Sequence, residues 1–335
     1  MSSTYRLGFT GDVMLGRLVN DTYQSGQRSP AALWGNLQSD LRELDGLFIN
    51  LECCLSTRGE PWPGRRFHFR ADPGWSTSAL RAATVDCCSL ANNHAMDFGT
   101  EALEETLKVL SAADVESVGA GRGRAAARRP TVVDCRGLTV ATVAFTDNVP
   151  DYAASPDRSG TAHVEFDPHD EASMAVLADA VDEAKRFDPD LLVASLHWGP
   201  NNRTQPLENH RAVARRLAEW DVDLIQGHSA HLFQGIEVIE GESPTVVCYD
   251  MGDFVDDYAV DPTHRNDRSF LFELVVGKGG KLLELVCQPT EIESRAVYHA
   301  SKRGAAWCRK TIQKRSEPFD TDFDRVGTGL VCSLA

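Results

Sequence analysis

Short apolar runs alternate with amphipathic stretches along most of the chain of 335 residues. The runs are short and rich in β-branched residues, which favours strands over buried helices. Strands are therefore predicted at residues 5–10, 46–50, 86–90, 131–133, 139–146, 191–196, 222–226, 245–249, 270–276 and 282–288.

Between these runs, apolar positions recur at helical spacing in residues 100–113, 171–187, 209–219 and 305–314. Such alternation of strand and helix predicts a layered α/β domain. Residues 245–288 contain predicted strands with no helix between them, so part of the sheet is expected to be antiparallel. We expect residues 1–300 to form the main domain and residues 301–335 to form a C-terminal helical extension and tail.

The charge balance excludes one large class of partner. The chain carries 34 basic and 49 acidic side chains, for a net charge of −15. A general nucleic-acid binder normally has the opposite sign, so no nucleic-acid partner is expected. No apolar run approaches the roughly 18 residues of a membrane span, and the first residues lack a signal-peptide pattern. The nine cysteines include no CxxC pair, so we expect a reduced, cytoplasmic protein without a membrane partner.

Polar side chains follow six of the apolar runs at the point where each run ends. They are Asp12; Asn50 and Glu52; Asn92, Asn93 and His94; His197 and Trp198; His228 and His231; and Asp250 and Asp253. In an α/β sheet, ligands bind at the carboxyl ends of the strands. Carboxylate and amide oxygens suit hard divalent cations, and imidazole suits borderline ones. The sequence therefore predicts a metal site at this edge.

The motifs at these strand ends resemble the ordered motif set of the CapA-type capsule and poly-γ-glutamate biosynthesis proteins. They are GDVMLGR (11–17), NLE (50–52), SLANNHAMDFG (89–99), HWG (197–199), GHSAHLFQG (227–235) and DMGDF (250–254). That family is similar in fold to the calcineurin-like metallophosphatases. The resemblance implies a metallophosphatase-like layered α/β/β/α sandwich with mixed sheets.

The resemblance also implies a ligand set for one or two divalent ions, with Ca²⁺, Mn²⁺, Mg²⁺ and Zn²⁺ all open. Asp12 and His231 would bind the first ion, and Glu52 would bridge both. Asn93, His197 and His228 would bind the second ion, and His94 matches the family's outer-sphere acid histidine.

Two positions depart from the metallophosphatase pattern. The histidine expected two residues after the first aspartate is Met14, a poor ligand for hard ions, and the bridging carboxylate is Glu52 where aspartate is usual. The first site is therefore short of a ligand and suits an oxygen-loving ion such as Ca²⁺ or Mn²⁺. This departure disfavours simple phosphomonoester hydrolysis.

A second group of residues is predicted to contact the substrate. Basic side chains crowd the segment between NLE and NNH, at Arg58, Arg65, Arg66, His68 and Arg70. Arg65, Arg66 and Arg70 would clamp a carboxylate or phosphate, unless the segment is only a solvated loop. Trp198 would supply an apolar wall, or would pack in the core. Asp250, Asp253, Asp256 and Asp257 are expected at the rim, where some would orient the histidines.

The leading functional hypothesis is a metal-dependent peptide epimerase. Some members of the resembled family are similar to metal-dependent peptide epimerases, which invert a Cα centre in a ribosomal, lasso-type precursor or a γ-glutamyl peptide. A substrate with a free carboxylate is expected. A metal bound by Glu52, Asn93, His197 and His228 would polarise a carbonyl, and a side-chain pair would exchange the Cα proton. The candidates for that pair are Asp12, His94 and His299, although His299 also fits a surface position. The alternatives are a dinuclear metallophosphoesterase and a component of capsule or poly-γ-glutamate biosynthesis. The oligomeric state stays open.

Overall fold

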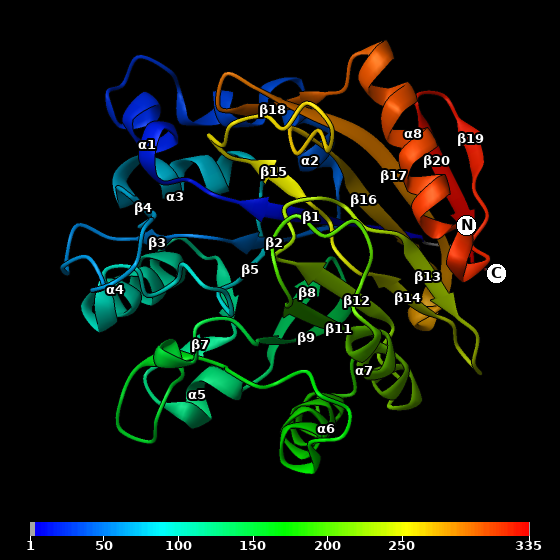
Figure 1. The fold of residues 1–335 in the computed structure, drawn as a ribbon, viewed down its shortest axis with the longest axis horizontal. Helices are drawn as coiled ribbons and strands as arrows, with labels where there is room; N and C mark the ends of the chain where they lie inside the picture. The colour runs from blue at the N-terminus through cyan, green and yellow to red at the C-terminus, as the bar shows by residue number, and fades with distance from the viewer. Residues whose placement is uncertain (1–3, 335) are drawn as a thin grey trace.

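Two large sheets are stacked face to face in the computed structural model, which describes residues 4–334 (Figure 1). The larger sheet runs in the order β19 (Asp324–Val326), β20 (Gly329–Ser333), β17 (Leu282–Glu293), β16 (Arg268–Val276), β1 (Tyr5–Val13), β2 (Gly46–Leu51), β5 (Cys87–Ser89) and β6 (Glu116–Val118), with β15 (Asp253–Val255) beside β1 and β18 (Ala296–His299) beside β17.

The smaller sheet runs in the order β13 (Ile236–Ile239), β14 (Thr245–Cys248), β12 (Leu224–His228), β11 (Leu191–His197), β9 (Leu138–Thr146) and β8 (Thr131–Cys135). Two short pairs accompany the sheets, β3 (Cys54–Leu55) with β4 (Arg70–Ala71) and β7 (Ala120–Gly121) with β10 (Gly160–Thr161). Both large sheets are mixed: β1 is parallel to β2 and antiparallel to β16, and β14 is parallel to β12 and antiparallel to β13.

Helices cover the outer faces of the two sheets. The larger sheet is covered by α1 (Arg17–Gln24), the 3₁₀ segment η1 (Pro30–Leu37), α2 (Gln38–Glu43), α3 (Pro73–Ala82) and α4 (Gly99–Ala112). The smaller sheet is covered by α6 (Glu171–Lys185) and α7 (Glu208–Glu219), at the bottom of the view in Figure 1. The remaining helical segments are α5 (Arg124–Arg128), η2 (Pro150–Tyr152), η3 (Lys278–Gly280), α8 (Lys302–Ser316) and η4 (Glu317–Phe319).

Alternation along the central strands explains the layers. In β2, Phe48 faces the core between the sheets, whereas Ile49 faces the core under the helices. In β11, Val193 faces the smaller sheet's inner side and Leu192 its helix side. Because successive side chains of a strand point to opposite faces, a strand buried on both faces is apolar throughout. The predicted layered α/β/β/α sandwich with mixed sheets is confirmed.

Several helices begin where the sequence supplies a cap. Asp72 and Asp170 each accept a hydrogen bond from a backbone N–H in the first turn of α3 and α6, and Ser301 does the same for α8. Residues 301–335, predicted to be an extension and tail, contribute α8 and the strands β19 and β20, and β20 pairs with β17. In the described part of the chain, residues 4–334, no helix combines the length and apolar character needed to cross a membrane.

Candidate metal centre

The carboxyl ends of four strands meet at one edge of the stacked sheets. Asp12 lies opposite Asn50 in the parallel pairing of β1 with β2. His197 lies opposite His228 in the parallel pairing of β11 with β12. Parallel register thus places two polar residues at the same height in each sheet, and stacking of the sheets brings the two pairs together.

A close backbone approach adds the segment after β14. The N–H of Asp12 donates to the carbonyl of Gly252 at 2.8 Å, and a Cβ on Gly11 would lie 1.8 Å from that same oxygen. Glycine is therefore required at position 11 for this approach. The approach puts β15 parallel to β1 with Asp12 opposite Asp253.

Asp12 is the centre of the resulting cluster. His228 Nδ1 lies 3.2 Å from Asp12 Oδ1, and His231 Nδ1 lies 3.4 Å from Asp12 Oδ2. His231 Nδ1 also lies 2.8 Å from Asp253 Oδ1. The backbone of His231 is left-handed, with φ of 57°. For a residue other than glycine this conformation is strained, and such strain concentrates at functional sites.

Glu52 and His197 form the other side of the cluster. His197 Nε2 lies 4.0 Å from Glu52 Oε1, and both side chains are fully buried. Asn50 Nδ2 donates to Asp12 Oδ1 at 2.7 Å and lies 3.4 Å from His197 Nδ1. Asp12, Glu52 and His197 each place one ligand atom within 4.8 Å of the others, and so do Asp12, His231 and Asp253. The two groups share Asp12.

Many of the buried polar atoms in this cluster have no hydrogen-bond partner among the described residues. They are Asp12 Oδ2, Glu52 Oε1, His197 Nε2, Asp253 Oδ2 and both ring nitrogens of His228, and Asn93 Oδ1, in the motif of His94, is unpaired as well. Leaving one such atom buried and unpaired costs about 1–3 kcal/mol. Oxygen and imidazole donors in this number fit divalent cations. The residues present therefore suit the predicted metal ions, which would bind to these unpaired atoms.

The electrostatics of the cluster also favour a cation. Burial raises the pKa of Glu52 well above its usual value, and the charge of Asp12 raises it further. Burial also raises the pKa of Asp253 well above normal. Burial would raise the pKa of Asp12 too, but the neighbouring His228 and His231 side chains outweigh it and hold that pKa well below normal. Carboxylates packed at this density repel one another, and a divalent cation relieves that repulsion.

His94 is held beside the cluster by an aspartate of its own motif. His94 Nδ1 lies 2.5 Å from Asp97 Oδ2, and Tyr152 Oη donates to Asp97 Oδ1 at 2.9 Å. The ring stacks on Phe69 with centroids 3.8 Å apart. Burial lowers the pKa of His94 in spite of the Asp97 charge. A neutral imidazole that donates from Nδ1 to Asp97 keeps Nε2 as a proton acceptor.

The cluster opens onto a pocket of about 500 Å³. His94 and His231 line it, together with Arg17 and Tyr258. The Arg17 guanidinium is paired with Asp257 and lies over the Tyr258 ring, 5.4 Å from its centroid. A substrate in this pocket would therefore meet His94 and one of the proposed metal ligands, His231.

Some predicted residues do not reach the cluster. His299 lies at the end of β18, where its Nε2 is 3.1 Å from Asp40 Oδ2. Trp198 is buried, donates from its ring nitrogen to the Tyr249 carbonyl and stacks on His210. Successive side chains along an extended chain point to opposite faces of the sheet. Because His197 points to the cluster, Trp198 points the other way and packs in the layer under α7.

The arginines predicted to clamp the substrate, Arg65, Arg66 and Arg70, make different contacts in the structure. Arg65 donates to the carbonyl of Asn93 at 2.7 Å and lies 3.8 Å from Asp97, so it contacts the site. Arg66 lies over the ring of Phe67. Arg70 lies over the ring of Phe98, 3.9 Å from its centroid, its guanidinium donates to the carbonyls of Arg58 and Gly59, and it is not among the residues that line the pocket. The role of a clamp remains a prediction for Arg65 and has no contact to support it at Arg70.

Three residues of the site, Asp97, Arg17 and Tyr258, were not singled out for it by their sequence pattern. The spacing of three between His94 and Asp97 is one signal that could have found Asp97. Arg17 closes the first motif, GDVMLGR, but its type alone gives no role. Asp253 was predicted both as a strand-end residue of the metal site and as a rim acid, without a ligand role of its own. Tyr258, whose hydroxyl lies 3.4 Å from Glu52 Oε2, had no signal.

Comparisons with known proteins agree with the motif set. The profile of a family described as "Bacterial capsule synthesis protein PGA_cap" matches residues 6–258. A probable polyglutamine synthesis accessory protein of Mycobacterium tuberculosis is 32% identical over 301 residues, which is 85% of this chain and 77% of that protein. The PGA biosynthesis protein CapA of Bacillus subtilis is 28% identical over 252 residues, covering 74% of this chain and 62% of that protein.

Among solved structures, a hypothetical protein from Thermus thermophilus aligns with a TM-score of 0.50 and 18% identity. The alignment covers 88% of this chain and 100% of that one. At this identity the likeness concerns the fold alone.

Proposed function

Because the chain belongs to the family of bacterial capsule synthesis proteins, we propose that it is a metal-dependent enzyme that hydrolyses amide bonds in a polypeptide with free carboxylates, such as a polyglutamyl chain. The observation that carries this proposal is the set of buried, unpaired oxygen and nitrogen donors around Asp12, which opens onto a pocket beside His94.

In the proposed hydrolysis, His94 would transfer protons and Arg65 would hold His94 in position. Asp12, Glu52, His197, His228 and His231 would hold the ion, which when bound would supply Lewis acidity toward a carbonyl group. His94, held neutral by burial and oriented by Asp97, accepts a proton from the attacking water at Nε2. Water adds to the carbonyl carbon, the C–N bond breaks, and His94 returns the proton to the leaving amine. Arg65 fixes the backbone of Asn93 and thereby the position of the neighbouring His94.

Epimerisation of a Cα centre is the second candidate. It is supported by two proton-carrying side chains, His94 and Tyr258, which line the same pocket. Inversion needs one group to remove the Cα proton and another to return it on the opposite face. Asp12 is less suited to this role than the sequence suggested, because Asn50, His228 and His231 surround its carboxylate.

One experiment separates the two reactions. The protein is incubated with a γ-linked glutamate oligomer and Mn²⁺ in D₂O, and both new amine ends and deuterium at Cα are measured. We expect new amine ends that disappear with a chelator and in His94→Ala. The matched control is His169→Ala, because His169 is an exposed histidine before α6, and it should retain the activity.

The other outcomes are equally specific. Deuterium at Cα without new amine ends would replace hydrolysis by epimerisation. In that case His299→Ala tests whether the remote histidine takes part. A protein that binds metal but gives neither product with this oligomer contradicts the proposed activity on polyglutamyl chains.

A further inference from the structure

We propose that Asp253 is a direct ligand of the first metal ion and takes the place of the histidine ligand that Met14 replaces. This inference rests on the metal centre of the proposed function and adds a ligand that the motif resemblance does not assign. It makes the first site Asp12, Asp253 and His231, with two carboxylates and one imidazole.

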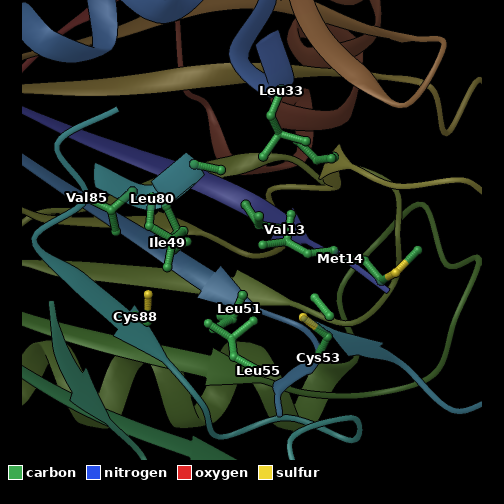
Figure 2. Packing of buried hydrophobic residues seen from close by; sticks show 14 of the residues in the cluster. Val13, Met14, Leu33, Ile49, Leu51, Cys53, Leu55, Leu80, Val85 and Cys88 are labelled. Carbon is green, nitrogen blue, oxygen red and sulfur yellow. The ribbon is translucent and has the colours of Figure 1, made fainter. Parts of the chain in front are cut away.

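Met14 itself is not available as a ligand. Its side chain is fully buried in the core under the helices, and Figure 2 shows it there with Val13 and Cys53. Its sulfur accepts a hydrogen bond from the N–H of Gly16 at 3.0 Å. The ligand missing from the first site must therefore come from another segment.

The pairing of β15 with β1 supplies that segment. Asp253 stands opposite Asp12 in parallel register, and the register shifts immediately afterwards, between Asp12 and Val13. The Asp253 side chain is 1% exposed, so it does not reach solvent. One of its oxygens, Oδ1, contacts His231, and the other, Oδ2, has no hydrogen-bond partner among the described residues.

Asp12 and Asp253 thus each have one buried carboxylate oxygen, Oδ2, without a hydrogen-bond partner among the described residues. Ligand atoms of Asp12, Asp253 and His231 lie within 4.8 Å of one another. An aspartate that only oriented His231 would need one oxygen for that contact and would leave the second exposed to water or paired. A buried, unpaired second oxygen is instead what a cation would bind.

The donor set predicts which ion prefers this site. Replacing an imidazole by a carboxylate shifts the site toward oxygen ligands, which suit Mn²⁺, Mg²⁺ and Ca²⁺ better than Zn²⁺. The second site keeps His197 and His228, so the two positions should differ in their preference. The two sites would then fill in two separable steps.

Titration calorimetry with Mn²⁺ on chelator-stripped protein tests the assignment. We expect wild type to bind two ions and Asp253→Ala to bind one. Because loss of a residue that merely orients a ligand costs roughly 10–100-fold in affinity, loss of the ligand itself should exceed about 100-fold at the first site. Asp182→Ala is the matched control, since this acid is exposed on α6 in the smaller sheet's helix layer, and it should bind two ions as wild type does.

Anomalous scattering from Mn²⁺-soaked wild-type crystals gives a second readout that needs no variant. An ion within about 2.0–2.6 Å of an Asp253 oxygen is expected. Two ions in Asp253→Ala, or an ion coordinated by Asp12 and His231 but not by Asp253, would overturn the assignment and leave the proposed function intact. Wild type that binds no divalent ion would overturn both.

Discussion

His210 is buried in the layer of side chains behind the metal ligands, and its ionisation affects the stability of the fold. Its ring lies in α7, is 4% exposed and stacks on Trp198 with centroids 4.5 Å apart and planes 3° apart. Trp198 directly follows the predicted ligand His197. Burial, with a smaller effect from Arg203, lowers the pKa of His210 from 6.5 to about 4. The ring is therefore neutral in the folded protein over a range where it is charged in the unfolded chain.

The sign of the pH dependence follows from that lowered pKa. Below pH 6.5 the unfolded chain binds a proton at His210, whereas the folded protein does so only near pH 4. Stability is consequently lost as the pH falls between these values. Near pH 5 the loss amounts to about 2 kcal/mol, because each unit of pKa difference is worth about 1.4 kcal/mol.

Urea denaturation of chelator-treated wild type and His210→Phe, at about pH 7.5 and about pH 5, measures this effect. The absolute stability of the variant depends on how well phenylalanine packs, so the informative quantity is the change in the difference between the proteins. Relative to wild type, His210→Phe should gain about 2 kcal/mol on going to the lower pH. His169→Phe, at an exposed position, should show no such gain. An unchanged difference for His210→Phe would refute the buried, neutral ring.

Two further predictions concern the centre itself. Glu52→Gln should raise the melting temperature of the metal-free protein, because it removes one of several buried carboxylates. It should also reduce the stabilisation by added Mn²⁺, which for wild type is about 2.7 kcal/mol at 100 times the dissociation constant. A lower melting temperature of the metal-free variant would contradict this. Arg65→Ala should cost about 1.5–3 kcal/mol in urea denaturation, because it removes a charged donor from Asn93 and Asp97. Arg66→Ala should stay within about 0.5 kcal/mol because Arg66 is exposed, and equal losses in the two variants would show that the segment acts as a single solvated loop.

The strand-end part of the site could be predicted from the sequence because it depends on local pattern. Asp12, Glu52, His197 and His228 each stand at or just after an apolar run, and the parallel registers β1–β2 and β11–β12 then place them at one edge. The same reasoning predicts the central strands, which are apolar throughout because both of their faces are buried. These features need no knowledge of which distant segment packs where.

The remaining features depend on long-range pairing or on local backbone geometry. Asp253 lies beside Asp12 only because β15 pairs with β1, and glycine at position 11 permits this close approach of the two backbones. His299 also follows a strand, but β18 runs antiparallel to β17 and packs on η1, so its end lies beside Asp40. Short helices such as α1 and α2 were missed because their few turns give too little periodicity.

The position of β1 in the larger sheet has a consequence for synthesis of the chain. β1 lies between β2 and β16, and β16 begins only at Arg268. At the usual 5–20 residues per second, the ribosome needs roughly 15–50 s to add the residues between β1 and β16. During this time one edge of an apolar central strand lacks its partner, and unpaired edges of this kind promote aggregation. The nascent chain is therefore expected to depend on chaperones until β16 has emerged, and slowing translation beyond residue 260 should lower the soluble yield.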